Sequence, residues 1–174
     1  MDDFRSRFGR SLLMLGLCTP LAAESLEVGM PAPGFTLTDA DRVPHHLSDY
    51  SGQWLVLYFY PKDDTPGCTT EACAFRDEIM LIHKLGAQVV GVSVDDADSH
   101  REFTDKYSLP FPLLSDPEGR VADRYGARGG LLGMVFAKRQ TFLIDPEGIV
   151  RHLWRTVSPD KHAREVITVL EGFQ

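Results

Sequence analysis

Residues 53–95 read QWLVLYFYPKDDTPGCTTEACAFRDEIMLIHKLGAQVVGVSVD. The stretch begins with a continuous apolar and aromatic run that ends at Pro61, and it closes with a second apolar run, QVVGVSVD. Continuous apolar runs of this length are typical of strands that are buried on both faces of a sheet. Between the two runs, apolar residues recur at helical spacing from Cys68 until Gly86, which is a helix stop signal. The stretch therefore predicts a strand, a helix and a second strand.

Patterns on either side of this unit add further elements. A short strand is expected around Phe35 to Leu37, and RVPHHLSDYSG indicates a second short strand and a loop. Downstream, DADSHREFTDKYSL predicts an amphipathic helix, FPLLSD a short strand, and PEGRVADRYGA a turn with a short helix. QTFLIDPEGIVRHLW predicts two strands joined by a turn.

The last segments complete the expected fold. SPDKHAREVITVLEGF predicts a closing helix, with Ser158 or Asp160 as its N-terminal cap. The glycine-rich segment within 126–139 is expected to be irregular, without the strand and helix that would make it a phosphate loop. Early alternation of strands and helices followed by a late hairpin favours an α/β fold with a central mixed sheet flanked by helices on both faces. A thioredoxin-like fold in a single domain, residues 24–174, fits this order.

Composition excludes several classes of protein. The chain has 174 residues, a formal net charge of −7 and no run of Lys or Arg, so binding to nucleic acid is not expected. Only three cysteines are present, which excludes a scaffold built on disulfides. The six histidines show no pair with zinc-binding spacing, so no metal site is expected.

Residues 1–23 differ from the rest of the chain. MDDFRSRFGR carries three arginines, and residues 11–23 are apolar and end in small side chains. This layout is typical of a secretory signal peptide, and its apolar run is too short to span a bilayer. We expect cleavage after Ala23 and export, to the periplasm if the source is bacterial, with no membrane insertion after processing. Two alternatives stay open: an uncleaved or misassigned extension with a true start near Met30, which implies a cytoplasmic protein, and a lipid anchor at Cys18.

Cys68 lies where the predicted helix begins. A helix N-terminus presents unpaired N–H groups and a partial positive charge, and both favour a thiolate, the reactive form of cysteine. Thr65 precedes Cys68 by three residues, so its hydroxyl is a candidate contact for the sulfur or for a substrate. The same residues also fit a helix N-cap threonine followed by a small buried cysteine.

Pro61, Thr65 and Cys68 spell P-x-x-x-T-x-x-C, which resembles the peroxidatic motif of peroxiredoxins. YFYPKDDTPGCTTEA is similar to the peroxiredoxin Q, or bacterioferritin-comigratory, branch. Three further segments agree in order: VGMPAPGFTL, SLPFPLLSDPEGRVADRYG and RQTFLIDPEGIV. The resemblance covers residues 26–174 and implies a thioredoxin-like fold.

The resemblance implies a role for each matching residue. Cys68 matches the peroxidatic nucleophile, which becomes a sulfenic acid. Thr65 matches the hydroxyl that holds the peroxide and the thiolate. Arg139 matches the guanidinium that stabilises the thiolate and polarises the peroxide, although an arginine before a strand is also an ordinary solvated residue.

Three positions have supporting roles. Pro61 matches the residue that shields the pocket from water, and Glu71 matches a position that often supports the arginine. The backbone N–H groups near Gly67 and Cys68 are further candidate donors to the leaving oxygen.

Cys73 follows Cys68 by five residues, and one regular helix places their Cα atoms roughly 8–9 Å apart. A disulfide needs a Cα separation below about 7 Å. We therefore expect the start of the helix to unwind after Cys68 is oxidised, so that Cys73 attacks the sulfenic acid and forms an intramolecular disulfide. The resemblance agrees, since one branch has its resolving cysteine at this offset. The alternatives are a buried core cysteine and half of a permanent structural disulfide.

Together, these features predict a thiol-dependent peroxidase that reduces hydrogen peroxide and organic hydroperoxides without a metal or organic cofactor. The resemblance implies a thioredoxin-like partner as the reductant and, since this branch is often monomeric, a monomer as the assembly. One alternative is a thioredoxin-fold disulfide oxidoreductase, which the absence of C-x-x-C disfavours. The other is a redox-sensing binding protein without peroxidase activity.

Overall fold

The structure is a computed structural model that describes residues 26–174. The predicted signal peptide, residues 1–23, lies outside the described residues. The elements follow in chain order: β1 (Thr36–Thr38), β2 (Pro44–His46), the 3-10 helix η1 (Leu47–Tyr50), β3 (Trp54–Phe59), α1 (Pro66–Lys84), β4 (Ala87–Ser93), α2 (Ala97–Tyr107), β5 (Leu113–Ser115), α3 (Arg120–Arg124), β6 (Arg128–Leu131), β7 (Met134–Ala137), β8 (Gln140–Ile144), β9 (Val150–Trp154) and α4 (His162–Glu171).

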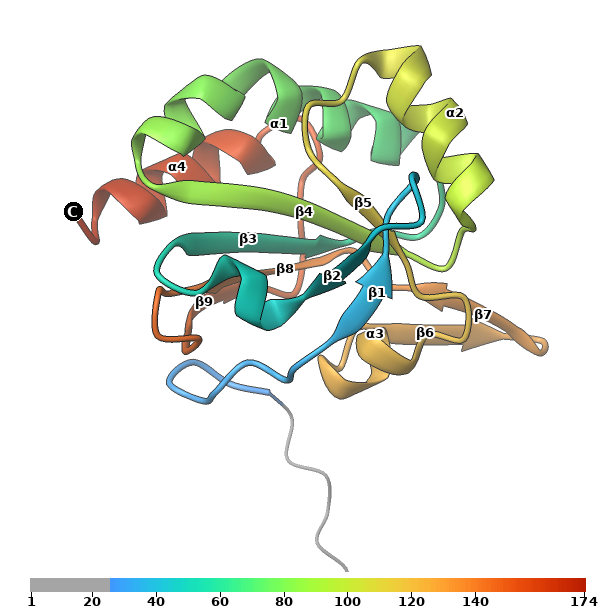
Figure 1. Ribbon diagram of the computed structural model, residues 1–174, viewed down its shortest axis with the longest axis horizontal. Coiled ribbons are helices and arrows are strands. Elements are labelled where there is room, and N and C mark those ends of the chain that lie inside the picture. Colours follow the sequence, from blue (N-terminus) through green and yellow to red (C-terminus); the bar gives the residue numbers. More distant parts are fainter. Residues whose placement is uncertain (1–25) are drawn as a thin grey trace, which may run out of the picture.

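Seven of the strands form one mixed sheet in the order β2-β1-β5-β4-β3-β8-β9 (Figure 1). β3 lies inside this sheet, where it pairs in parallel with β4 and antiparallel with β8. The predicted strand–helix–strand unit is therefore β3–α1–β4, and the predicted late hairpin is β8–β9. The expected mixed sheet with flanking helices is confirmed.

The alternating side chains of β3 separate two hydrophobic cores. Val56 and Tyr58 face a cluster that contains buried residues of α1 and α4, whereas Leu55 and Leu57 face a cluster that contains buried residues of α3. In Figure 1, α1, α2 and α4 accordingly lie on one side of the sheet, and α3 lies on the other with the β6–β7 hairpin. Both faces of β3 are covered, which explains its uninterrupted apolar sequence.

The glycine-rich segment differs from its expected irregular form. Residues 128–137 make a β-hairpin in which Leu131 pairs with Met134. Leu132 and Gly133 both have positive φ, 51° and 84°, as a two-residue type I′ turn requires. Leucine is an unusual residue for the first of these positions, so the sequence gives little sign of this turn.

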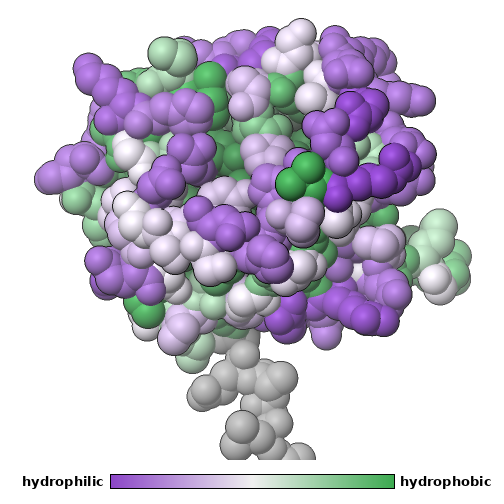
Figure 2. All heavy atoms as spheres, viewed as in Figure 1, coloured by the Kyte–Doolittle hydropathy of each residue, from purple (hydrophilic) through white to green (hydrophobic). Residues whose placement is uncertain are grey.

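The tip of this hairpin is apolar and exposed. Leu131, Leu132 and Met134 have exposed fractions of 62%, 92% and 65%. The surface around the hairpin is mostly hydrophilic in Figure 2, where the tip is seen as an apolar projection at the edge of the molecule.

The cap predicted for the last helix is also wrong. α4 begins at His162 with Lys161 as its N-cap residue, and no side chain caps it. Ser158 instead accepts hydrogen bonds from the backbone N–H groups of Lys161 and His162 through its carbonyl oxygen. The turn before α4 therefore satisfies donors that a side-chain cap would otherwise bind.

Between residues 26 and 174, the structure contains no helix with the length and apolar character needed to cross a membrane.

Candidate active site

Cys68 lies in the first turn of α1, on the side of the sheet that α1 and α4 cover. Thr65 is the N-cap residue with an extended backbone, and Pro66 occupies the first helical position, where its missing N–H removes no hydrogen bond. The helix therefore begins two residues before the predicted start. The Cys68 side chain is only 2% exposed and makes no disulfide. A buried sulfur at a helix N-terminus is thus placed beside unpaired backbone donors.

Arg139 connects Cys68 to Glu71. Its Nη2 atom donates a hydrogen bond to Cys68 Sγ at 3.1 Å, and its Nη1 atom donates to Glu71 Oε2. Burial opposes a charged guanidinium, but the charges of Glu71 and Cys68 outweigh it and raise the pKa of Arg139. Arg139, from a distant part of the sequence, therefore contacts two predicted residues of α1, and it stays a cation.

Glu71 is fully buried within this group. Burial is the main influence and raises the pKa of Glu71 to about 7, while Arg139 acts in the opposite direction. Its Oε1 atom has no hydrogen-bond partner among the described residues. Glu71 thus titrates near neutral pH although it pairs with an arginine.

Gly67 provides room for the guanidinium. A Cβ atom at this position would lie 3.3 Å from Arg139 Nη2, which is tighter than an ordinary contact. The glycine therefore allows the first turn of α1 to pass close to the arginine.

The Thr65 hydroxyl has a different contact from the expected one. It donates a hydrogen bond to the Lys62 carbonyl oxygen at 3.0 Å, and no hydrogen bond joins it to Cys68 within residues 26–174. Because its one proton is used there, its oxygen remains free to accept a hydrogen bond. Pro61 is half-buried at the end of the β3 run, next to fully buried Tyr60.

Cys73 is half-buried and free, and α1 is continuous from Cys68 through Cys73. The two cysteines therefore belong to one intact helix in this state of the protein. The structure describes the state before the predicted rearrangement, and the unwinding stays a prediction.

Two buried groups near the site were not found by sequence reasoning. His162 shares a hydrogen bond of 2.7 Å between Nε2 and Thr141 Oγ1, and burial together with the Arg139 charge lowers its pKa to about 4. Tyr58 is fully buried, and burial with the nearby Glu71 charge raises its pKa well above the usual value. Nothing in the local sequence marks either residue, because each reaches the site only through strand pairing and helix packing.

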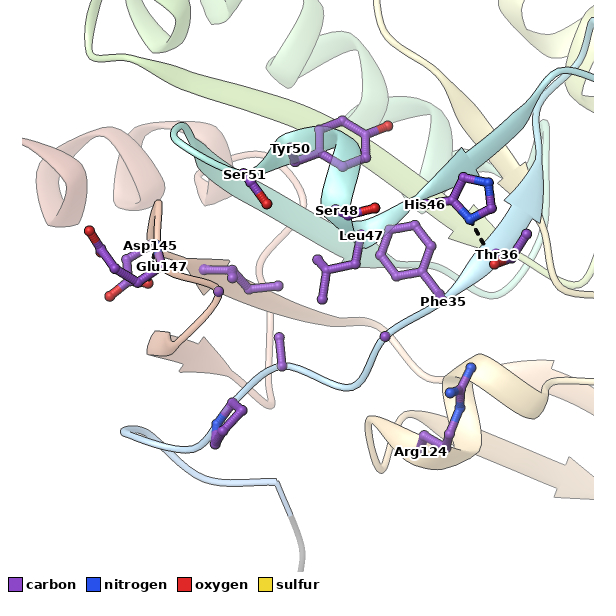
Figure 3. Close-up of a pocket in the computed structure, with 15 residues that line it drawn as sticks. Phe35, Thr36, His46, Leu47, Ser48, Tyr50, Ser51, Arg124, Asp145 and Glu147 are labelled. Atoms are coloured by element: carbon purple, nitrogen blue, oxygen red, sulfur yellow. Dashed lines mark hydrogen bonds between the residues drawn. The ribbon is translucent and has the colours of Figure 1, made fainter.

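A separate cavity of about 780 Å³ lies between residues 31–36, η1 and the β8–β9 turn (Figure 3). Phe35, Tyr50 and Arg124 are among its lining residues, and Thr36 Oγ1 and His46 Nδ1 are 2.9 Å apart at its rim. None of the predicted site residues lines it. The described part of the chain also has no group of three or more His, Cys, Asp or Glu residues that could hold a metal ion.

Comparisons with known proteins agree with this geometry. The AhpC/TSA family profile matches residues 28–153. The chain is 45% identical over 145 residues to the chloroplastic peroxiredoxin Q of Oryza sativa subsp. japonica, with 83% of this chain and 66% of the rice protein covered. It is also 45% identical over 147 residues to the putative peroxiredoxin bcp of Coxiella burnetii, with 82% of this chain and 97% of the relative covered.

Solved structures give the same result. The crystal structure of the peroxidoxin BcpB from Mycobacterium tuberculosis matches with a TM-score of 0.81 and 36% identity over 86% of this chain and 99% of that chain. The bacterioferritin comigratory protein of Xanthomonas campestris, studied for its alkyl peroxide reduction activity, matches with a TM-score of 0.77 and 36% identity over 85% of this chain and 97% of that chain. The chain therefore belongs to the AhpC/TSA family, in its peroxiredoxin Q and bacterioferritin comigratory protein branch.

Proposed function

We propose that this protein is a thiol-dependent peroxidase that reduces hydrogen peroxide and organic hydroperoxides at Cys68. The observation that carries the proposal is the 3.1 Å hydrogen bond from Arg139 Nη2 to Cys68 Sγ. A guanidinium stays charged and has several fixed donors, so it can contact the sulfur and an adjacent peroxide oxygen together. The family of the chain and the activity studied in the Xanthomonas campestris relative support this chemistry.

In the proposed reaction, the Cys68 thiolate attacks one peroxide oxygen and the O–O bond breaks. The sulfur becomes a sulfenic acid, and the leaving oxygen takes a proton and departs as water or an alcohol. Arg139 and the backbone N–H groups of the first turn of α1 stabilise the charge that develops on the leaving oxygen. The Thr65 hydroxyl already donates its hydrogen bond to the Lys62 carbonyl oxygen, so its oxygen accepts a hydrogen bond from the peroxide O–H.

Cys73 is the proposed resolving residue. Its sulfur attacks the Cys68 sulfenic acid, the S–O bond breaks, and water leaves as the disulfide forms. A thioredoxin-type protein is the proposed reductant of this disulfide. Cys73 is half-buried in the same continuous helix, where regular geometry places its Cα atom roughly 8–9 Å from that of Cys68, and this supports a step that first unwinds the start of α1.

The experiment that tests the function follows peroxide consumption with a thioredoxin-type reductant. We expect Cys68→Ser to abolish consumption and Cys73→Ser to allow one round of oxidation but no turnover with that reductant. A folded wild-type protein that exchanges disulfides but consumes no peroxide would instead be an oxidoreductase, and one with neither activity would be a sensor or binding protein. Unchanged turnover in Cys73→Ser would remove its resolving role.

We also propose that the protein is exported after cleavage behind Ala23 and that it is a monomer. The basic and apolar layout of residues 1–23 supports export. N-terminal sequencing of the mature protein and light scattering in solution test the two proposals, and a retained N-terminus or a stable dimer would contradict them.

A further inference from the structure

The loop that precedes α1 is fastened to α2 by two adjacent carboxylates. Asp63 is buried and accepts hydrogen bonds from the Tyr60 hydroxyl at 2.7 Å and from the Ser99 hydroxyl at 2.8 Å. Its Oδ2 atom also lies 2.8 Å from His100 Nδ1. Ser99 and His100 belong to the first half of α2, so this end of α2 fixes the loop from inside the protein.

Asp64 makes the second attachment, at the opposite end of α2. Its carboxylate accepts hydrogen bonds from Lys106 Nζ at 2.6 Å and from the Tyr107 hydroxyl at 2.7 Å. Both bonds lower the pKa of Asp64, with Lys106 the larger cause. Asp64 has a φ of 53°, a left-handed conformation that aspartate adopts more readily than most residues with a side chain. The two hydrogen bonds attach this turn of the loop to the end of α2.

Tyr107 of α2 also binds α1, at a position beyond Cys73. Arg76 Nη1 donates a hydrogen bond of 2.8 Å to the Tyr107 carbonyl oxygen, and its Nε donates to Asp77 Oδ1 at 2.9 Å. Arg76 lies one helical turn after Cys73, and its charge interacts with the Cys73 sulfur. Tyr107 thus binds both flanks of the segment 65–75: its hydroxyl binds Asp64, and its carbonyl oxygen binds Arg76.

The segment between these two attachments is the one that the proposed disulfide must unwind. It contains Cys68, Glu71 and Cys73. Cys68 and Glu71 bind Arg139. The Phe75 ring packs against the rings of Tyr58 and His162. On the C-terminal side, Phe75 is fully buried in the core, so α1 is also fixed from there onward. Unwinding is therefore confined between fixed ends, and each attachment to Tyr107 opposes it.

We propose that Tyr107 is a positioning residue that sets the balance between the intact and the unwound start of α1. The inference rests on the proposed peroxidase function, since the balance decides the fate of the Cys68 sulfenic acid. In the unwound state, Cys73 attacks the sulfenic sulfur, and the disulfide and water form. In the intact state, a second peroxide oxidises the sulfenic acid to a sulfinic acid and leaves as water or an alcohol. Weaker attachment to Tyr107 favours the disulfide at the expense of the sulfinic acid.

The test uses Tyr107→Phe, which removes the bond to Asp64 and keeps the ring and the carbonyl oxygen. Reduced protein is treated with increasing hydrogen peroxide, and intact-mass spectrometry measures the ratio of disulfide to sulfinic acid. We expect this ratio to rise about two- to fivefold. This is the low part of the range for the loss of one hydrogen bond, because the Asp64 side chain is half-exposed and water weakens its hydrogen bonds. Lys106→Met, which removes the other donor to Asp64, should shift the ratio in the same direction.

The matched control is Arg42→Gln. Arg42 also binds α2, because its Nη2 atom lies 2.8 Å from Asp98 Oδ1 in the first turn of that helix. Among the described residues, no hydrogen bond or ion pair joins Arg42 to residues 62–77. Its ratio of disulfide to sulfinic acid should equal that of the wild type. A shift of equal size in Arg42→Gln would show a general effect on α2 and overturn the inference.

Hydrogen exchange separates this inference from the proposed function. In the reduced protein, without peroxide, the amides of residues 69–73, which follow the first turn of α1, should exchange faster in Tyr107→Phe than in the wild type, and those of β3 should not change. Unchanged exchange, or an unchanged ratio in a protein that consumes peroxide normally, overturns the role of Tyr107. Faster exchange in a protein that consumes no peroxide supports the attachment and rejects the peroxidase function alone.

Discussion

Arg139 is the residue on which the proposed chemistry depends most, because it contacts the sulfur with one nitrogen and the buried Glu71 with another. Lysine carries the same charge but only a single ammonium group, so it cannot hold this geometry. Its neighbour Lys138 is exposed and has no such contact. The two adjacent cations therefore have separable roles.

We expect Arg139→Lys to lower the second-order rate of reaction with hydrogen peroxide about 10²-fold, a typical effect of losing one donor that stabilises developing charge. Competition against a peroxidase of known rate measures the change. The control is Lys138→Gln, which should keep the wild-type rate. A wild-type rate in Arg139→Lys would mean that positive charge alone, and not the geometry of the contact with Cys68, accounts for the effect.

At the residue scale, sequence resemblance brought Cys68, Glu71 and Arg139 into one predicted site, and the structure places them in contact. Thr65 shows the limit of that reasoning, because the direction of a hydroxyl proton depends on the local loop and not on the motif. His162 shows a second limit. It lies on the last helix of the chain, and only packing brings it under the influence of Arg139.

At the scale of elements, the first turn of α1 is both a helix start and a wall of the site. Gly67 must both be helical and leave space for the guanidinium, since a Cβ atom there would lie 3.3 Å from Arg139 Nη2. Alanine favours helix by about 0.5–1 kcal/mol over glycine in an interior position. Local helix preference and the space needed by the guanidinium therefore oppose each other at this residue.

We expect Gly67→Ala to keep the helical circular dichroism and the melting temperature of the wild type, and to lower the rate of reaction with peroxide about tenfold because the guanidinium must move away from the sulfur. Stopped-flow measurement of Cys68 oxidation, run beside thermal melts, checks both parts. A variant with the wild-type rate would show that the arginine tolerates the methyl group.

The elements predicted with the right type are those with long, regular apolar patterns, such as β3, α1 and β4. The β6–β7 hairpin was missed because its glycines and exposed leucines follow no period-two pattern, and its pairing is fixed by a turn with two positive φ angles. Local sequence determines such a turn weakly, and the rest of the fold must support it.

At the scale of the whole molecule, Glu71 links the site to the stability of the fold. Its pKa rises from 4.5 to about 7 on folding, so the folded protein keeps a proton that the unfolded chain has lost. The stability from this group is fully present below about pH 4.5 and is lost as the pH rises through about 7. His162, with a pKa lowered to about 4, has the opposite sign: its contribution is present above about pH 6.5 and is lost as the pH falls through about 4.

We expect Glu71→Gln to change the pH dependence of the free energy of unfolding, measured with urea between about pH 5 and 7.5. The glutamine cannot titrate, so the variant lacks the stability that Glu71 contributes at low pH, and lower pH destabilises it more than the wild type. The difference between the two profiles should reach about 2 kcal/mol over this range. Glu102→Gln, at an exposed position of α2, is the control, and parallel profiles for Glu71→Gln and the wild type would contradict the expectation.

The strand order of the whole sheet could not be read from the sequence. Local patterns give the elements and their order along the chain, but β1 pairs with β5 and β3 pairs with β8 across long stretches of sequence. These pairings follow from which faces must be buried together, and they place β8 beside β3. Arg139, which directly precedes β8, thereby meets the helix that follows β3.

The near-complete burial of the Cys68 sulfur, 2% exposed, imposes an order on its reactants. The surface of a folded protein cannot approach a residue buried to this extent. While α1 is intact, other protein thiols and disulfides are thus kept from exchanging with Cys68. A protein reductant gains access only after oxidation has changed the shape of the segment, so each cycle accepts the oxidant first and the partner second.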